Sequence, residues 1–517
     1  MGITATRTKN TIKNMLFGML SKVISLLFPF AVRTIIIYKL GAEYAGFGSL
    51  FTAILQVLSI TELGFASAIT FALYEPIAKS DTNKIVELIG LLKSIYVLVG
   101  GIILTIGLLL MPFIPYFIKG DVPVDVNVYV LYSIYLANAT ITYFAFGYES
   151  SLLSAHQRYD IISKVNTITE IVKGILQILV LLFTNNFYAY IILLPVFSFV
   201  SSIIIHMLSI KLYPELNVKT KYSLKGLDCI KKQIGGIAIG RISLVCRNSF
   251  DSIVISSLFG LTVTVIYANY YLIINTITSF LLTLIISMSA SIGNSLVTES
   301  IEKNEKDHLK FDFYYMAIVG VCTVMMFNLY QPFMKLWVGE ELLFPFKTMF
   351  LFPLYFYINN LSQVRSAYSE AAGLWWHFRY FSVGEMIANL SLNIGLGIWL
   401  GVDGILIATI ITAFVCSFLA TTKLTYKLLF HTSSSKYYLL NVLYIIITFG
   451  ICVLSYFINS LILIEGWGGL IINLVVSLIL SCVIMLVIYL LIKRTRGYIL
   501  DLLRLVIRKK EKKTGAK

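Results

Sequence analysis

Long apolar runs alternate with short segments of charged and turn residues along almost the whole chain. A helix that crosses a bilayer needs about 20 mostly apolar residues, and most of the runs reach that length. The pattern therefore predicts an all-α polytopic membrane protein with about 14 transmembrane helices. The predicted spans are 13–38, 45–74, 85–112, 126–153, 161–184, 187–210, 232–259, 262–296, 310–334, 344–370, 378–400, 402–426, 437–463 and 467–492.

The basic residues between the runs are distributed very unevenly between the two sides of the predicted membrane. With the N-terminus inside, 31 Lys and Arg residues fall in inner segments, and only four fall in outer ones, namely Lys39, Lys119, Lys335 and Lys347. Cytoplasmic loops of membrane proteins carry such an excess of positive charge. We therefore expect both termini in the cytoplasm. The first apolar run is too long for a cleaved signal peptide.

The composition agrees with a membrane protein and changes the meaning of the net charge. Of 517 residues, 58% are hydrophobic and 13% are charged, against about 45–50% and about 25% in soluble domains. A net charge of +15 would suggest a nucleic-acid partner in a soluble protein, but the positive inner loops account for it here. We predict membrane lipids and no nucleic acid as partners. The basic tail at 493–517 either binds anionic headgroups or is a solvated end.

Nothing in the sequence predicts catalytic, metal or cofactor chemistry. The chain contains no GxxxxGK[ST], HExxH, GxSxG or CxxC motif, so the usual signatures of nucleotide, zinc and nucleophile sites are absent. Its six cysteines and five histidines are scattered. The loops are too short to fold into the extramembrane platform that a membrane glycosyltransferase or polymerase needs. We therefore expect a protein that is not an enzyme.

Short matches about 221 residues apart indicate an internal repeat. The segment 156–159 (HQRY) resembles 377–380 (HFRY), and 75–79 resembles 299–303. Six spans make an even number of crossings, so both copies have the same orientation, as in transporters built from parallel repeats. The expected parts are an N-terminal six-helix bundle at 1–210, a cytoplasmic linker at 211–231, a C-terminal six-helix bundle at 232–426, two additional helices at 427–492 and a basic cytoplasmic tail at 493–517.

Several segments resemble one family of transporters. These are 31–47 (AVRTIIIYKLGAEYAGF), 58–68 (LSITELGFASA), 251–260 (DSIVISSLFG) and 336–340 (LWVGE). They are similar to motifs of Wzx-type polysaccharide transporters, the lipid-linked oligosaccharide flippases of the multidrug/oligosaccharidyl-lipid/polysaccharide exporter superfamily. The segment 257–267 departs from the family because it lacks the usual glycine before Tyr267. The resemblance implies a location in the cytoplasmic membrane of a bacterium, near glycan polymerase and glycosyltransferases.

Charged residues inside the predicted spans are the candidates for substrate binding. A charge at the centre of a spanning helix costs about 2.5–3.5 kcal/mol on insertion scales, so such residues usually face a cavity or a partner. Lys22 and Arg33 are eleven residues apart, so they share one helix face on either side of Pro29. The basic candidates for a diphosphate are Lys22, Arg33, Lys173, Arg241, Arg247 and Arg365.

Three of these basic residues also have a purely structural interpretation. Glu170 and Lys173 stand at i and i+3, and Arg247 and Asp251 at i and i+4, so each pair can neutralise itself on one helix face. Arg365 is close enough to the inner end of its span to extend its guanidinium to the interface. These alternatives stay open at the level of sequence.

Polar and acidic residues in the spans are candidates for glycan or coupling-ion binding. Glu385, Asn389 and Asn393 form an i, i+4, i+8 stripe, which either binds sugar hydroxyls or forms hydrogen bonds to a neighbouring helix. Glu62, Asp251 and Glu385 are the acids that could carry proton or sodium coupling. Flipping driven by consumption of the product is the uncoupled alternative.

Together these features predict an alternating-access flippase for a polyprenyl-diphosphate-linked oligosaccharide, such as an O-antigen, capsule or other surface polysaccharide repeat unit. Basic side chains would bind the diphosphate, and the glycan would lie in a hydrated cavity. The nearest alternative is a peptidoglycan-precursor flippase. A cation-coupled multidrug exporter would be expected to have twelve spans and an acidic cavity, and a membrane glycan polymerase a large outer loop.

Overall fold

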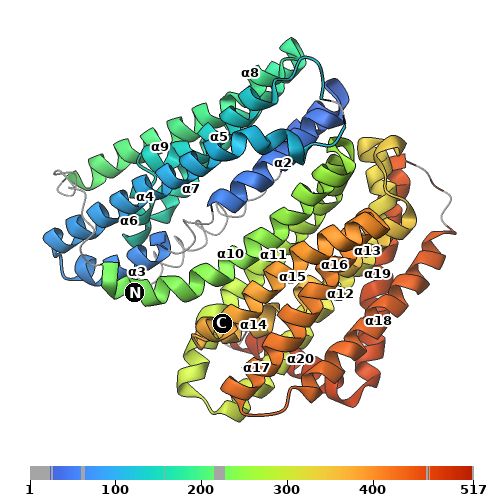
Figure 1. The fold of residues 1–517 in the computed structure, drawn as a ribbon. Coiled ribbons are helices and arrows are strands. Elements are labelled where there is room, and N and C mark those ends of the chain that lie inside the picture. Colours follow the sequence, from blue (N-terminus) through green and yellow to red (C-terminus); the bar gives the residue numbers. More distant parts are fainter. Residues whose placement is uncertain are drawn as a thin grey trace. The chain divides into compact units, whose positions relative to one another are not determined.

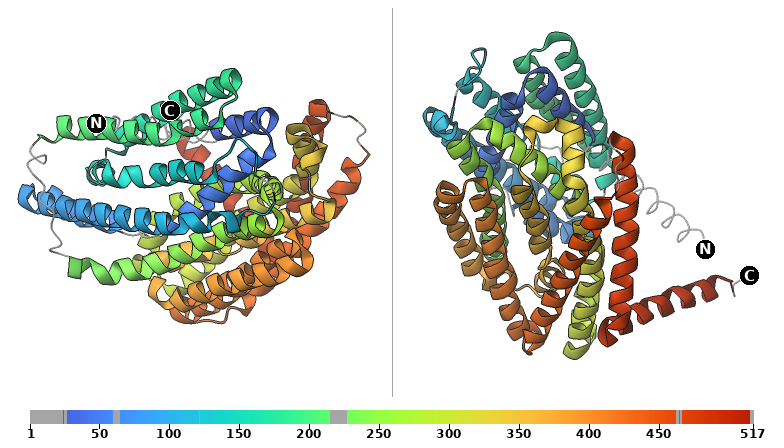
Figure 2. Two further views of the ribbon diagram at one scale, coloured as in Figure 1. Left: turned by 45° about the horizontal axis from the view of Figure 1, so that its top comes forward. Right: turned by 90° about the vertical axis from the view of Figure 1, so that its right-hand side faces the viewer.

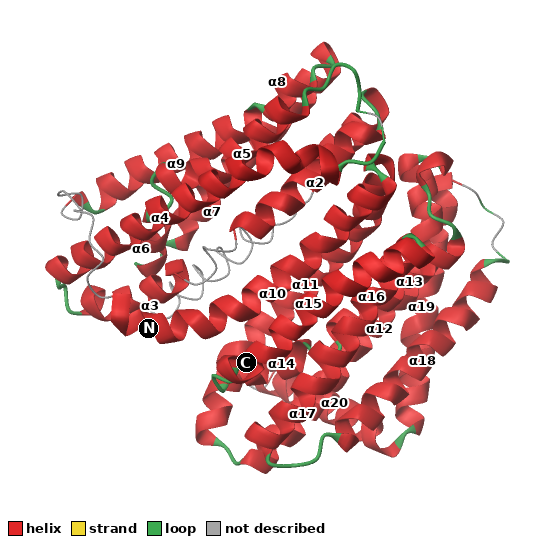
Figure 3. Cartoon of the chain, viewed as in Figure 1, coloured by secondary structure: helices red, strands yellow, loops and turns green. Residues whose placement is uncertain are grey.

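The computed structural model describes residue 24 and residues 27–514, apart from 60–64, 121, 157, 215–226, 462–463 and 465. The described residues form helices, turns and loops, with no strand among them (Figure 3). Ten of the described helices are long and apolar enough to cross a membrane, and a bent pair brings the number to 11 if it counts as one span. The prediction of an all-α polytopic membrane protein is confirmed.

Polar side chains at the ends of the apolar runs determine where several helices begin. Asp81 accepts a hydrogen bond from the backbone N–H of Lys84, and Asn127 accepts two from the first turn of the next helix. Asn186 and Ser300 cap two further helices in the same way. A capping oxygen satisfies a backbone donor that has no partner within the helix. The helix starts are therefore encoded locally.

The chain divides into two compact units, the first ending at Ala268 and the second beginning at Asn269. This division falls inside helix α11 (Leu261–Thr298). Helix α10 (Leu227–Phe259) therefore groups with the N-terminal elements, whereas the sequence repeat placed it at the start of the second bundle. The superposition of two six-helix halves stays a prediction.

The first unit contains a bundle in which α4, α5, α7 and α9 run alongside one another (Figure 1). The predicted span 126–153 is broken here, because α5 and α6 meet at an angle of 51° near Phe146, whose φ is +60°. Gly46 allows close contact with the start of α11, since a Cβ there would lie 2.6 Å from the Leu261 carbonyl oxygen. The described elements before α10 are α2 (Ala42–Leu58), α3 (Phe65–Ala78), α4 (Thr82–Leu110), η2 (Met111–Phe117), α5 (Val128–Phe144), α6 (Glu149–Ala155), α7 (Tyr159–Thr184), α8 (Phe187–Ile191) and α9 (Leu193–Leu212).

The second unit is organised around α12, which packs against α13, α18 and α19 (Figure 1). The predicted span 344–370 is interrupted at Leu361. The predicted span 402–426 contains one π-helical segment and ends where a second begins. Its elements after α11 are α12 (Ile301–Val338), η4 (Glu340–Leu342), α13 (Phe346–Asn360), α14 (Gln363–Ala371), α15 (Trp375–Leu400), α16 (Val402–Thr412), η5 (Ala413–Ala420), α17 (Thr421–Thr425), η6 (Tyr426–Phe430), α18 (Ser435–Asn459), α19 (Gly466–Leu491) and α20 (Lys493–Thr514).

Most of the basic tail forms helix α20, which turns sharply away from α19 in the right-hand view of Figure 2. Lys310 Nζ of α12 lies 3.1 Å from Asp501 Oδ2, and the Tyr314 hydroxyl donates to the Tyr498 carbonyl at 2.7 Å. These contacts hold the first turns of α20 against α12. Binding of anionic lipid headgroups by the tail stays a prediction.

Candidate functional site

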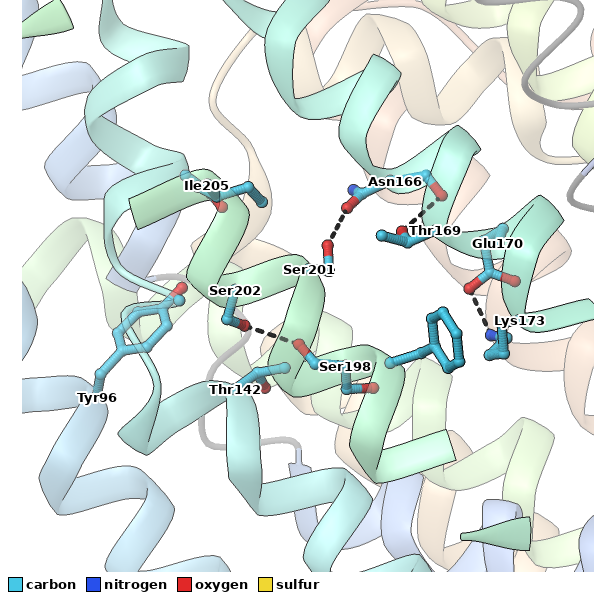
Figure 4. Close-up of a pocket in the computed structure, with 13 residues that line it drawn as sticks. Tyr96, Thr142, Asn166, Thr169, Glu170, Lys173, Ser198, Ser201, Ser202 and Ile205 are labelled. Carbon is cyan, nitrogen blue, oxygen red and sulfur yellow. Dashed lines mark hydrogen bonds and ion pairs between the residues drawn. The ribbon is translucent and has the colours of Figure 1, made fainter. Parts of the chain in front are cut away.

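A polar pocket of about 450 Å³ lies inside the first unit. Its walls come from four helical segments that are separate in sequence, namely α4, the bent α5–α6 pair, α7 and α9 (Figure 4). Because these helices pack together, polar side chains that stand within separate apolar runs of the sequence line one pocket. The lining residues are Tyr96, Thr142, Gly147, Ser150, Asn166, Thr169, Glu170, Lys173, Phe197, Ser198, Ser201, Ser202 and Ile205.

Hydroxyl and amide groups dominate the wall of this pocket. The Ser201 hydroxyl donates to Asn166 Oδ1 at 3.0 Å, which ties α9 to α7. Within the described part of the chain, no hydrogen bond engages the Thr142 hydroxyl or the Asn166 amide nitrogen. These two groups therefore have hydrogen-bonding capacity left for water or a ligand.

Glu170 and Lys173 supply the charges of the pocket. Lys173 Nζ lies 2.6 Å from Glu170 Oε1, and the two side chains are 18% and 36% exposed, respectively (Figure 4). The structure thus forms the i, i+3 pair that was one of the two interpretations of these residues, and it places that pair at the pocket wall. Next to Lys173, Gly174 packs against Phe28, because a Cβ on Gly174 would lie 2.1 Å from the Phe28 ring.

Arg33 lies on the same helical stretch as Phe28, residues 27–39, about 7.5 Å further along its axis. The guanidinium is partly buried and donates to the Ser49 hydroxyl at 3.2 Å and to the Val265 carbonyl at 3.3 Å. Of the other candidates on early spans, Lys22 and Glu62 lie outside the described residues. Arg241 lies on α10, but its side chain is not among those that the structure describes.

Arg247 and Asp251 are both buried in α10, with 5% and 2% of their surfaces exposed. Asp251 Oδ2 accepts a hydrogen bond from the Tyr267 hydroxyl at 2.8 Å. The seventh predicted span therefore bonds to the start of the next helix within the first unit. Tyr267 belongs to the segment 257–267, where the family resemblance is weakest.

Arg365 and Glu385 meet through Ser417 in the second unit. The Arg365 guanidinium donates to the Ser417 carbonyl at 2.9 Å, and the Ser417 hydroxyl donates to Glu385 Oε2 at 2.6 Å. Arg365 is only 4% exposed and lies 5.7 Å from the centre of the Phe378 ring. The expectation that it extends to the membrane interface is therefore wrong. The carbonyl of a π-helical segment, η5, is available to accept this buried guanidinium.

The stripe on α15 bonds to its neighbouring helix. Asn389 donates to the hydroxyl of Thr409 at 3.0 Å and to that of Thr412 at 3.4 Å, both on α16. Asn393 donates to Asn389 Oδ1 at 3.2 Å, and both asparagines are fully buried. This is the helix–helix alternative that the sequence left open, and it uses donors that a sugar would otherwise engage.

Two groups of buried or partly buried titratable residues lie outside the predicted set. In the first unit, Glu149 Oε1 lies 2.7 Å from His206 Nδ1, and the His206 ring stacks on Phe146. In the second unit, Asp312 is 2% exposed and lies one helical turn after His308, which is fully buried. Among the described residues, no group of three or more His, Cys, Asp or Glu side chains could hold a metal ion.

Comparisons with known proteins place this fold among membrane transporters. No family model matches the sequence, and no curated protein matches it. The lipid II flippase MurJ in an inward closed conformation is similar in structure, with 14% identity and a TM-score of 0.68 over 92% of this chain and 99% of that one.

Two MATE transporters are also similar. An inward-facing MATE family transporter of the MOP superfamily has 14% identity and a TM-score of 0.60 over 79% of this chain and 95% of that one. The Vibrio cholerae MATE transporter VcmN in the bent form has 17% identity and a TM-score of 0.51 over 81% of this chain and 95% of that one. The chain is a multi-pass membrane protein with the fold of these transporters.

Proposed function

We propose that the protein is a flippase that moves a polyprenyl-diphosphate-linked oligosaccharide across the cytoplasmic membrane of a bacterium by alternating access. The diphosphate would bind basic side chains of the spans, and the glycan would lie among hydroxyl and amide groups. The polyprenyl chain would stay in the lipid. The fold that this chain shares with a lipid II flippase over 92% of its length supports a lipid-linked cargo.

The pocket in the first unit is the observation that carries the proposal. The pocket is lined by serine and threonine hydroxyls, the Asn166 amide and the aromatic residues Tyr96 and Phe197. Hydroxyl and amide groups can form hydrogen bonds to sugar hydroxyls, and aromatic rings can pack on the apolar faces of sugar rings. Its charged residues, Glu170 and Lys173, neutralise each other, so the pocket does not attract a cationic drug. A site for neutral, polyhydroxylated cargo fits this wall better than a site for a hydrophobic cation.

Arg33 supplies the second half of the proposal. A guanidinium binds two phosphate oxygens through parallel charge-assisted hydrogen bonds. Two of its acceptors, the Ser49 hydroxyl and the Val265 carbonyl, are neutral. A diphosphate oxygen would be a stronger acceptor than either of them, so exchange of these bonds on substrate binding is favourable.

The second candidate function is the flipping of a peptidoglycan precursor. The similarity to the lipid II flippase favours it, because that structure gives the highest TM-score of the three described above. Both functions use a diphosphate-linked lipid, and they differ in the attached group. The pocket wall does not distinguish a precursor sugar from a longer oligosaccharide.

Purified protein in liposomes tests the proposal directly. Labelled polyprenyl-diphosphate oligosaccharide, lipid II and a hydrophobic cationic dye are compared as cargo, and arrival of each at the opposite leaflet or lumen is measured. We expect movement of the oligosaccharide lipid and no movement of the dye. Movement of lipid II alone would select the second candidate, and movement of the dye alone would contradict both.

The direction of transport depends on the proposed orientation, which cysteine labelling of intact cells tests. A cysteine at Glu341, in the turn after α12, should react with an impermeant reagent added outside. A cysteine at Arg158, between α6 and α7, should react only after the membrane is opened. The reverse pattern would invert the orientation and the proposed direction of movement.

A further inference from the structure

The second unit contains a buried carboxyl group that none of the substrate contacts proposed above uses. Asp312 lies in α12, twelve residues into the helix, and is 2% exposed. Its Oδ1 accepts a hydrogen bond from the Tyr437 hydroxyl at 3.0 Å, and its Oδ2 accepts one from the Asn441 amide nitrogen at 3.3 Å. Tyr437 and Asn441 stand at i and i+4 on α18, so a single helix face supplies both donors.

No ion pair among the described residues includes Asp312. An ionised carboxylate without a counter-charge is expensive in a membrane interior, so two neutral donors stabilise it only in part. The groups that interact electrostatically with Asp312 are tyrosines of the surrounding helices, namely Tyr315 of α12, Tyr357 of α13, Tyr426 of η6, and Tyr437 and Tyr444 of α18. Next to these tyrosines lie the charged or titratable groups Arg365 of α14, Tyr489 of α19 and Arg494 of α20, and Arg365 also interacts with His308 of α12.

The hydrogen bonds of Tyr437 have an alternative that does not need Asp312. The Tyr437 hydroxyl lies 3.0 Å from the Leu361 carbonyl oxygen, the same distance as from Asp312 Oδ1. A single hydroxyl proton can be donated to only one of the two oxygens at a time. Leu361 stands at the break between α13 and α14, so the choice of acceptor decides whether α18 bonds to that joint or to α12.

Asn441 offers the corresponding alternative on the other side of the carboxyl group. Its amide nitrogen donates to Asp312 Oδ2 at 3.3 Å and to the Tyr437 backbone carbonyl at 3.1 Å, while its Oδ1 is buried and has no hydrogen-bond partner among the described residues. Rotation of this amide by a half-turn would present the oxygen to Asp312. A protonated carboxyl could then donate its O–H to Asn441, and Tyr437 could donate to Leu361. Asp312 and the Tyr437 hydroxyl thus each have a partner in both protonation states.

We propose that Asp312, with Tyr437 and Asn441, is the proton-binding site that couples transport to a proton gradient. Uptake of one proton converts the carboxylate into a neutral carboxyl and releases Tyr437 to the α13–α14 joint. Loss of the proton draws Tyr437 back to α12. This site rests on the proposed transport function and adds the coupling ion to it.

The triad suits a proton better than a metal cation. Both side chains that contact Asp312 do so through donors, and a cation such as sodium or calcium needs several oxygen acceptors around it. Among the described residues, the buried Tyr444 hydroxyl near the triad likewise has no hydrogen-bond partner. It is a further group that could change its bonding when the charge of the carboxyl changes.

Infrared difference spectroscopy of the purified protein tests the site without any cargo. Steps of pH should produce a carboxyl C=O band that is absent in Asp312→Asn. Asp403→Asn is the matched control, because Asp403 is a buried acid of the same unit whose Oδ2 lies 2.8 Å from Lys347 Nζ; it should leave the band unchanged. A band that survives in Asp312→Asn would overturn the proposal.

A second variant keeps the test decisive if Asp312→Asn fails to fold. Tyr437→Phe retains the carboxyl group but removes a donor to its ionised form, so the midpoint of the band should move to higher pH. An unchanged midpoint would mean that Tyr437 does not sense the proton, which would also overturn the proposal. A merely structural tyrosine would alter the thermal stability without moving this midpoint.

The transport measurement separates this proposal from the function on which it rests. In liposomes, a proton gradient should accelerate cargo movement by the wild type several-fold, whereas Asp312→Asn should move cargo at one rate with or without the gradient. A gradient response retained in Asp312→Asn would refute the coupling site. A pH-dependent band at Asp312, combined with no movement of any lipid-linked cargo, would instead refute the proposed function and leave the proton site standing.

Discussion

The two units treat their membrane-buried polar residues in different ways. In the first unit, side chains such as Thr142 and Asn166 border a pocket and keep hydrogen-bonding capacity. In the second, Arg365, Glu385 and Asn389 are almost wholly buried and bond to neighbouring helices. Similar residue types therefore have different roles, because Thr142 and Asn166 border a pocket, whereas Arg365, Glu385 and Asn389 lie between packed helices.

This difference leads to an expectation about substitutions. A polar group beside a pocket can exchange its partner for water or cargo, so its loss changes binding more than folding. A polar group sealed between helices leaves its partner unsatisfied when it is removed, at about 1–3 kcal/mol for each orphaned group. Substitutions in the first unit should thus reduce transport, and matched substitutions in the second should reduce stability.

The largest expected effect compares Arg33 of the first unit with Arg365 of the second. Arg33→Ala should lower transport about ten- to hundredfold, because each charge-assisted bond to phosphate contributes about 1.5–3 kcal/mol. Arg33→Lys should recover part of the rate, since an ammonium cannot bind two oxygens as a fork. Arg365→Ala should instead lower the melting temperature and the amount of protein in the membrane. Normal transport by Arg33→Ala at a normal protein level would remove Arg33 from the site.

The second prediction compares two asparagines by thermal unfolding. Asn389→Leu removes the acceptor of Asn393 and the donor to two threonines, so unfolding should become easier by about 1–3 kcal/mol. Asn166→Leu, at the pocket wall, should change the melting temperature little while reducing transport. Equal destabilisation by both variants would show that Asn166 is as tightly enclosed at the pocket wall as Asn389 is between α15 and α16.

The third prediction concerns two glycines that differ in the space around them. Gly174→Ala should destabilise the first unit by about 1–3 kcal/mol, because its Cβ would collide with the Phe28 ring. Gly395→Ala on α15 has no neighbouring atom within 4 Å of the new Cβ and should be neutral or slightly stabilising. The melting temperatures of both variants, with transport measured in parallel, provide the check. An unchanged melting temperature of Gly174→Ala would mean that the helical stretch 27–39 does not pack on α7.

The smallest effect is expected at two threonines. Thr142→Val removes a hydroxyl that faces the pocket, and the loss of one neutral hydrogen bond to cargo, about 0.5–1.5 kcal/mol, should lower transport about two- to tenfold. Thr323→Val replaces a buried hydroxyl that donates to the Val319 carbonyl of its own helix and should leave transport unchanged. A similar loss in both variants would contradict the contrast between the units.

The sequence predicted the helices well because a spanning helix needs a long apolar run whatever it packs against. It did not predict the breaks at Phe146 and Leu361, although Glu149 follows the first break and Asn360 and Ser362 flank the second, because each apolar run is long enough to be taken as one span. Whether an apolar run bends depends on whether neighbouring residues form hydrogen bonds with the backbone groups that the break leaves unpaired. Hydropathy carries no information about those neighbours.

The polar residues were predicted less completely, for a related reason. The spacing of Asn389 and Asn393 correctly placed them on one face, but periodicity could not say that the face meets α16. Asp312 was missed because the predicted span began at 310, whereas the Ser300 cap starts α12 at Ile301 and places the carboxyl group well inside the helix. The i, i+4 pair Tyr437 and Asn441 on another span was the available signal.

The π-helical segment η5 (Ala413–Ala420) makes the packing of its span sensitive to the loss of a single residue. A π-turn closes its hydrogen-bonded ring with one residue more than an α-turn. Loss of a single codon within this segment would therefore allow an unbroken α-helix to form and still cross the membrane. It would also rotate the Ser417 carbonyl away from Arg365, leaving a guanidinium without an acceptor. Deletions that look harmless in a hydropathy profile should accordingly be selected against in this segment.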